Sequence, residues 1–66
     1  METKTLAGLL KEAEEHHGPY EGSAPPHHWS GFYAAYIVAR EQGRNAEEAD
    51  QEARRYMAGV LAEDTQ

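Results

Sequence analysis

The sequence contains no cysteine, and this absence excludes several kinds of site at once. Disulfides, cysteine-ligated zinc, iron–sulfur clusters and thiol nucleophiles all need a residue that the chain lacks. The absence also fits a reducing compartment, so we expect the protein to be cytoplasmic. A single domain of 66 residues buries a small core, which leaves two stabilising helpers: a metal held by histidine or carboxylate, and association with another subunit.

Long apolar runs and basic segments are missing as well. No stretch approaches the roughly 18 apolar residues of a membrane helix, and the first residues, METKTLAGLLKEAEE, lack the apolar centre of a signal peptide. Twelve acidic and six basic residues give a formal net charge of −6, which repels phosphate. We therefore expect neither a membrane nor a nucleic acid as partner.

What the sequence does contain is apolar residues at helical spacing. The first such segment predicts a helix over residues 5–17. Gly18 and Pro19 should end it, because Gly suits the left-handed residue after a last turn and Pro cannot continue a helix. A loop over residues 18–27, rich in Gly and Pro, should follow. The predicted buried stripe consists of Leu6, Leu9, Leu10 and Ala13.

The second predicted helix covers residues 29–42, with His28 or Ser30 as its cap and Gly43 as its end. Its apolar residues form an unusually broad arc, which indicates contact with more than one neighbour and a central position in the fold. One face of this helix carries Trp29, Phe32, Tyr36 and Ala39, and Tyr33 and Ile37 lie beside it.

The third predicted helix covers residues 46–62. Asn45 and Glu48 have the spacing of a capping box, in which the two side chains bind each other's backbone N–H groups. The short connection before it predicts that the second and third helices are antiparallel neighbours. The sequence thus predicts one all-α domain over residues 1–66, a small three-helix bundle. The buried stripe of the third helix should contain Ala49, Ala53, Tyr56, Met57 and Val60.

The four histidines form two adjacent pairs on either side of the predicted loop. Imidazole is a common ligand of zinc, copper and nickel, and the loop should bring both pairs to one end of the bundle. Adjacent helical residues point in different directions, however, and no established ligand spacing is present. The ordinary alternative is that these residues end and cap helices. The candidate metal ligands are His16, His17, His27, His28 and Glu12, the last one turn before His16.

Four aromatic residues within eight positions are the candidate interaction residues. Such a cluster can line a pocket for a flat ligand, but in a small domain large side chains more often form the core. Catalysis has little support, because no G-x-S-x-G or comparable motif is present and we expect no enzymatic activity. The four residues are Trp29, Phe32, Tyr33 and Tyr36.

The broad apolar arc favours a function by contact, either self-association or binding to another protein. Two alternatives stay open. One is metal binding at the paired histidines. The other is sequestration of a flat small molecule, such as an aromatic drug, against Trp29 and Tyr36.

The segment PPHHWSGFYAAYIVAREQGRNAEEADQEARRYM resembles a group of short, stand-alone helical proteins of high-GC bacteria. The likeness rests on a Pro-x-His-x-Trp start, the run YAAYIVARE-x-G and a capped EEA helix. Some members of the group are classed as bleomycin-resistance or glyoxalase-type proteins, whose longer α/β fold has strands with no counterpart in this sequence. The resemblance implies a small helical protein without an established activity, and it assigns no catalytic or binding residue. Ser30 and Gly31 stand where bulkier or acidic residues often occur in the group.

Overall fold

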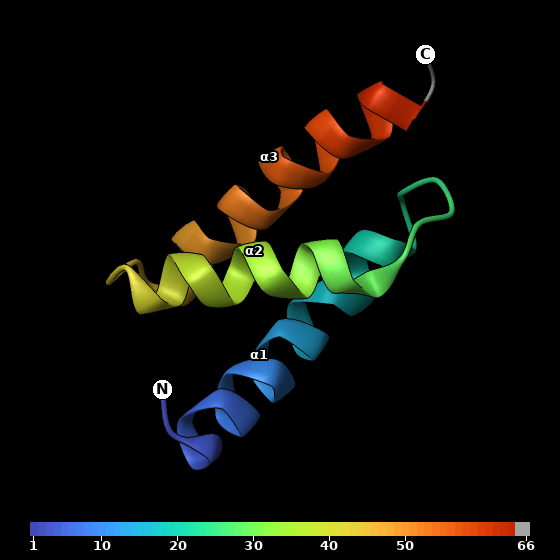
Figure 1. The fold of residues 1–66 in the computed structure, drawn as a ribbon. Coiled ribbons are helices and arrows are strands. Elements are labelled where there is room, and N and C mark those ends of the chain that lie inside the picture. The colour runs from blue at the N-terminus through green and yellow to red at the C-terminus, as the bar shows by residue number, and fades with distance from the viewer. Residues whose placement is uncertain (65–66) are drawn as a thin grey trace.

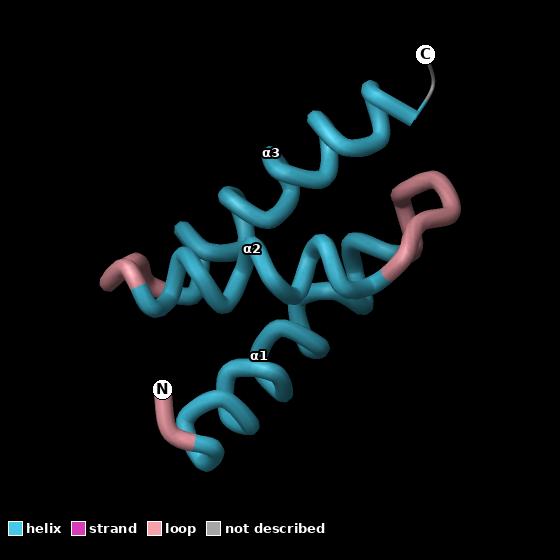
Figure 2. The backbone as a smooth tube through the Cα atoms, viewed as in Figure 1, coloured by secondary structure: helices cyan, strands magenta, loops and turns pink. Residues whose placement is uncertain are grey.

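The computed structural model describes residues 1–64, which form three α-helices joined by two short connections (Figure 1). The helices are α1 (Thr3–Glu21), α2 (Trp29–Glu41) and α3 (Ala46–Asp64). Figure 2 shows helices and loops only in this described part of the chain. The predicted all-α architecture of three helices is therefore confirmed.

The predicted end of the first helix is wrong. α1 continues through Gly18 and Pro19 and ends at Glu21, so the connection spans residues 22–28 rather than 18–27. Pro19 removes one backbone hydrogen bond of the helix. The loss is offset because Tyr20, in the extra turn, is buried and stacks on Phe32 with ring centroids 5.0 Å apart. Tertiary packing has overridden a local helix-ending signal.

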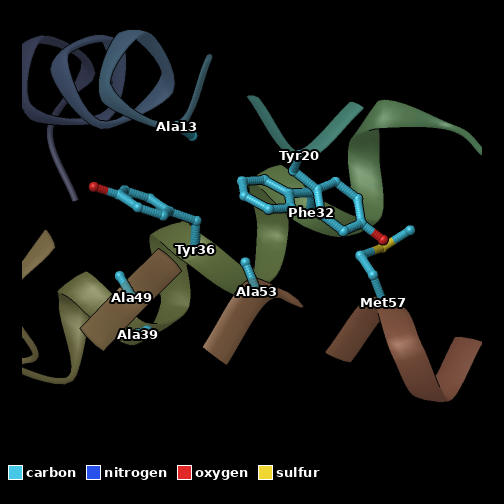
Figure 3. Close-up of a cluster of buried hydrophobic side chains, with 8 residues drawn as sticks. All are labelled: Ala13, Tyr20, Phe32, Tyr36, Ala39, Ala49, Ala53 and Met57. Atoms are coloured by element: carbon cyan, nitrogen blue, oxygen red, sulfur yellow. The ribbon is translucent and has the colours of Figure 1, made fainter. Parts of the chain in front are cut away.

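α2 is the central helix, as predicted, and both other helices pack mainly against it. Figure 3 shows the core that forms between them, with Phe32 and Tyr36 at its centre. Ala49 and Ala53 are fully buried and allow α3 to approach α2 closely. The buried apolar residues are Ala13, Tyr20, Phe32, Tyr36, Ala39, Ala49, Ala53 and Met57.

Several side chains that the sequence placed in the core are exposed instead. Leu6 and Leu10 are 39% and 38% exposed, because the buried residues of α1 all lie in its second half and its first half extends beyond the core. Trp29 and Tyr56 are each 52% exposed. The apolar surface is thus larger than the stripe pattern predicted.

The caps of α2 and α3 follow the sequence closely. His28 rather than Ser30 caps α2, since the His28 side chain accepts a hydrogen bond from the Ser30 N–H. Gly43, at φ +94°, adopts the left-handed conformation that follows the end of α2. The capping box is confirmed: Asn45 Oδ1 accepts from the Glu48 N–H at 2.8 Å, and Glu48 Oε1 accepts from the Asn45 N–H at 3.0 Å.

None of the helices in the described part of the chain combines the length and apolar character that a membrane crossing requires.

Candidate functional site

The first histidine pair divides between two sides of α1. Because the helix continues through both residues, they point about 100° apart, as their adjacent positions predicted. His16 faces α3, where its Nδ1–H donates to Asp50 Oδ1 at 3.1 Å. His17 faces the connection 22–28. The two residues therefore belong to different environments.

His17 meets His27 of the second histidine pair. Their Nε2 atoms are 3.0 Å apart. His17 is only 7% exposed, and its ring lies against those of Phe32 and Tyr33, with centroids 5.3 and 5.4 Å away. Tyr20 packs edge-on against the ring of His27 at 5.2 Å. The two imidazoles thus form a partly buried pair with aromatic walls.

The hydrogen bonds of this pair determine its proton positions. His27 Nδ1 is 2.7 Å from the Pro25 carbonyl oxygen, which can only accept, so Nδ1 carries the hydrogen. A neutral His27 then offers Nε2 as an acceptor, and His17 donates its Nε2–H to it. The remaining nitrogen of His17, Nδ1, faces Glu21 Oε2 at 3.8 Å.

His28 lies apart from this pair. Its Nδ1 accepts hydrogen bonds from the Ser30 N–H at 3.2 Å and the Ser30 hydroxyl at 2.8 Å. The exposed His28 ring also stacks on Trp29 with centroids 5.4 Å apart. Its observed role is that of a helix cap.

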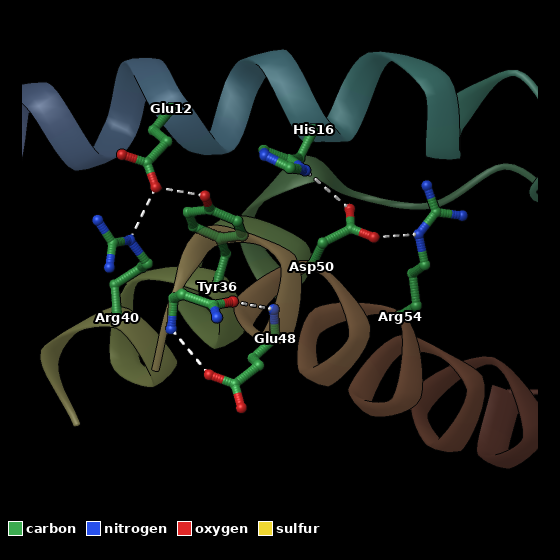
Figure 4. Close-up of polar contacts among 8 residues, drawn as sticks. Glu12, His16, Tyr36, Arg40, Glu48, Asp50 and Arg54 are labelled. Atoms are coloured by element: carbon green, nitrogen blue, oxygen red, sulfur yellow. Dashed lines mark hydrogen bonds and ion pairs between the residues drawn. The ribbon is translucent and has the colours of Figure 1, made fainter. Parts of the chain in front are cut away.

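Glu12 is engaged with α2 rather than with the histidines. Its Oε1 accepts from the Tyr36 hydroxyl at 2.5 Å and from Arg40 Nε at 2.8 Å (Figure 4). The Tyr36 hydrogen bond is the main cause that lowers the pKa of Glu12, and Arg40 lowers it further. Burial, and then the Glu12 carboxylate, raise the pKa of Tyr36 well above its ordinary value. This arrangement joins α1 to α2.

A second set of polar contacts joins α1 to α3. Asp50 accepts from His16 at one oxygen and from Arg54 Nε at the other, at 2.9 Å (Figure 4). The Arg54 guanidinium also lies over the ring of Tyr20, 5.4 Å from its centroid. This role of Asp50 was not predicted, although its spacing of four residues from Arg54 was a signal. We call the whole set the polar seam: Glu12, His16, Tyr36, Arg40, Asp50 and Arg54.

Of the five candidate metal ligands, the structure brings only His17 and His27 together. His16, His28 and Glu12 each have another partner. Across residues 1–64, no group of three or more His, Asp or Glu side chains is arranged to hold a metal ion. A metal site here would therefore use two protein ligands.

The four candidate interaction residues divide between core and surface. Phe32 and Tyr36 are fully buried, so their side chains cannot meet a partner directly. Trp29 is half exposed and Tyr33 partly buried, and their rings contact each other edge-to-face at 4.9 Å. Only Trp29 and Tyr33 remain available for contact at the surface.

Trp29 and Tyr33 border an open groove of about 410 Å³ between α1 and α2. Burial raises the pKa of Tyr33, and the nearby carboxylates of Glu14 and Glu21 raise it further. The groove is thus apolar with acidic residues at its edge. We call it the α1/α2 groove, and it is lined by Leu10, His17, Glu21, Trp29 and Tyr33.

A second groove of about 350 Å³ lies between α2 and α3. Val38 and Tyr56 border it and are 51% and 52% exposed. We call it the α2/α3 groove. It offers a surface of similar exposure on another side of α2.

Comparison with known proteins yields no family model, no curated protein and no solved structure that matches this chain. The function must therefore be argued from the geometry of the chain.

Proposed function

We propose that the chain is a helical contact module that pairs with a second copy of itself. The observation that carries this proposal is the exposed apolar surface beside the core. Leu10, Trp29 and Tyr33 line one groove, and Leu6 lies one turn before Leu10 on the same helix. Contiguous exposed apolar surface often marks an interaction site. We call Leu6, Leu10, Trp29 and Tyr33 the α1/α2 face.

The charge pattern of α1 favours a second copy as the occupant. The first half of the helix carries Lys4 and Lys11 as its only charged residues, and the second half carries carboxylates and no lysine or arginine. An antiparallel pairing of two α1 helices would place each basic half against an acidic half. A twofold arrangement of this kind uses the same surface on both copies. The carboxylates are Glu12, which is already paired with Arg40, and the exposed Glu14, Glu15 and Glu21.

Analytical ultracentrifugation over a wide concentration range tests the proposal. The wild-type chain should show a reversible dimer whose fraction rises with concentration. The double variant Leu10→Gln/Trp29→Ala should remain monomeric, because it removes apolar area from the centre of the face. Its circular dichroism should stay helical, since both residues lie largely outside the core.

Val38→Gln is the matched control, because Val38 is also half exposed but borders the α2/α3 groove. It should dimerise like the wild type. A chain that stays monomeric at every concentration would contradict the proposal. Loss of the dimer in the control alone would place the interface on the α2/α3 groove instead.

The α1/α2 groove is also the candidate site for the alternative function, sequestration of a flat aromatic molecule. Tyr36 cannot take part as the sequence suggested, because its side chain is fully buried. Trp29 and Tyr33 would hold the ligand instead. Trp29 is the only tryptophan, so a saturable change in its fluorescence on titration with a planar aromatic compound would report binding directly. A linear, unsaturable change would count against this alternative.

A further inference from the structure

We infer that His17 and His27 form a binding site for a borderline divalent cation, Zn²⁺, Cu²⁺ or Ni²⁺, held between their two Nε2 atoms. Neutral imidazole is a preferred ligand of all three metals. This inference does not depend on the proposed dimer.

The separation of the two nitrogens suits such an ion. From metal–nitrogen lengths of about 2.0–2.1 Å, two cis ligands lie roughly 2.9 Å apart at a right angle and roughly 3.3 Å apart at the tetrahedral angle. The observed Nε2–Nε2 distance of 3.0 Å falls between these values. Each ring must tilt so that its lone pair points beside the other nitrogen rather than at it. His27 lies outside the helices, so its ring can tilt without displacing a helical backbone.

The other nitrogen of each ring already faces an oxygen. A metal-bound histidine usually donates its second N–H to a carbonyl or carboxylate, which orients the ring. His27 Nδ1 donates to the Pro25 carbonyl at 2.7 Å. His17 Nδ1 faces Glu21 Oε2 at 3.8 Å. Besides this tilt of the rings, metal binding needs a change of tautomer at His17, in which the proton moves from Nε2 to Nδ1, on the side that faces the Glu21 carboxylate.

The pair is accessible to an ion from solvent. His27 is partly exposed and borders an open hollow of about 370 Å³ that also includes Glu21 and Pro26. Two imidazoles leave the remaining coordination positions of the metal to water. His27 borders this hollow and His17 borders the α1/α2 groove, so open space for the ion and its waters adjoins each of the two rings.

The divided histidine pairs supply matched controls. Each pair contributes one residue to the site and keeps one elsewhere: His16 binds Asp50 and His28 caps α2. Isothermal titration of tag-free protein with ZnCl₂ or CuCl₂ should show one metal ion per chain. His27 supplies one of the two protein ligands, so His27→Ala should weaken that binding by at least about tenfold, the loss that follows removal of even an outer-shell partner of a ligand. His28→Ala should bind as the wild type does.

Thermal melting provides a second readout, because a ligand that binds only the folded chain raises Tm with its concentration. His17 is buried, so His17→Ala can destabilise the fold by itself. The role of His17 is therefore tested by nitrogen-15 NMR of the wild-type protein instead of by substitution. On addition of ZnCl₂, the Nε2 resonances of His17 and His27 should shift and those of His16 and His28 should not. Absence of binding, or binding that survives His27→Ala, would overturn the inference. Equal loss in His28→Ala would do so too.

Discussion

The interface between α2 and α3 differs in kind from the docking of α1 onto them. α3 approaches α2 through small apolar residues, Ala49 and Ala53, and the flexible side chain of Met57 fills the space beside Gly31. α1 contributes fewer apolar residues to the core, Ala13 and Tyr20, and meets the other two helices through the polar seam as well. One interface is close-packed and non-directional, whereas the other depends on oriented hydrogen bonds and charges.

This difference has consequences for pH and for specificity. Apolar contact between α2 and α3 does not change with protonation, so that pair should persist where α1 is weakened. The polar seam orients α1, because each of its hydrogen bonds has a defined direction and partner. Partly exposed ion pairs contribute little energy individually, so the seam should specify position more than it stabilises. The two regions can therefore be tested separately.

The largest effect should come from Phe32, where the two regions meet. It is fully buried on α2 and stacks with Tyr20 of α1. Phe32→Ala should lower the free energy of unfolding by about 3–5 kcal/mol, as deletion of a core aromatic side chain does. Urea denaturation followed by circular dichroism measures this loss. Trp29→Ala, on the same helix but half exposed, should cost less than about 1 kcal/mol. Similar losses in both variants would mean that the aromatic core is not centred on Phe32.

A smaller loss should follow when the seam alone is cut. Tyr36→Phe removes the hydrogen bond to Glu12 and leaves the aromatic ring in the core. We expect a loss of about 1–2 kcal/mol, since a hydrogen bond to a charged group is stronger than a neutral one but Arg40 still holds the carboxylate. Urea denaturation again provides the measurement. Tyr56→Phe, on the exposed surface of α3, is the control and should change stability little. If the two variants had the same free energy of unfolding, the hydrogen bond of Tyr36 to Glu12 would not contribute to the docking of α1.

Acid should weaken the docking of α1 before it affects the contact between α2 and α3. The folded state lowers the pKa of Glu12, so its stabilising contribution is present above the unfolded value of about 4.5 and is lost as pH falls through the lower folded value. Stability measured between neutral pH and pH 3 should therefore fall in the acid range. Glu12→Gln should flatten this fall. Glu41→Gln, an exposed carboxylate at the end of α2, is the control and should retain it. An unchanged acid profile in Glu12→Gln would show that other carboxylates govern it.

The fold was largely predictable because its strongest signals are local. Helical spacing and the capping box of Asn45 and Glu48 act over a few residues, and the structure confirms both. The end of α1 was not predictable in this way. Pro19 is a helix-ending signal, and only the burial of Tyr20 against Phe32 explains why the helix continues. The exposure of Leu10 also depends on how far α1 extends beyond the other two helices. The spacing of apolar residues within α1 does not indicate this extent.

The candidate site shows the same limit. Adjacent positions on a helix correctly predicted that His16 and His17 would separate. The sequence could not identify which partner each one meets, because Asp50 and His27 are brought there by the crossing of α1 over the other elements. Glu12 does lie one turn from His16, but its carboxylate accepts hydrogen bonds from Tyr36 and Arg40 instead. Side-chain direction was predictable, whereas long-range pairing was not.

The smallest predicted effects compare two glycines, one in each region. A Cβ atom on Gly31 would lie 2.9 Å from Met57 Sδ, within the close contact of α2 and α3. Gly8, in the exposed first half of α1, has nothing within 4 Å of that position. Gly8→Ala should raise the free energy of unfolding by about 0.5–1 kcal/mol, the usual helical preference for alanine.

Gly31→Ala gains the same preference but must displace the buried Met57 side chain, so we expect a net loss of up to about 1 kcal/mol. Thermal and urea denaturation of both variants measure the difference. The opposite signs are the informative result, because both substitutions make the same chemical change in a helix. If Gly31→Ala stabilised the protein as much as Gly8→Ala, the interface between α2 and α3 would have space for an added methyl group. Close packing would then not distinguish this interface from that of α1.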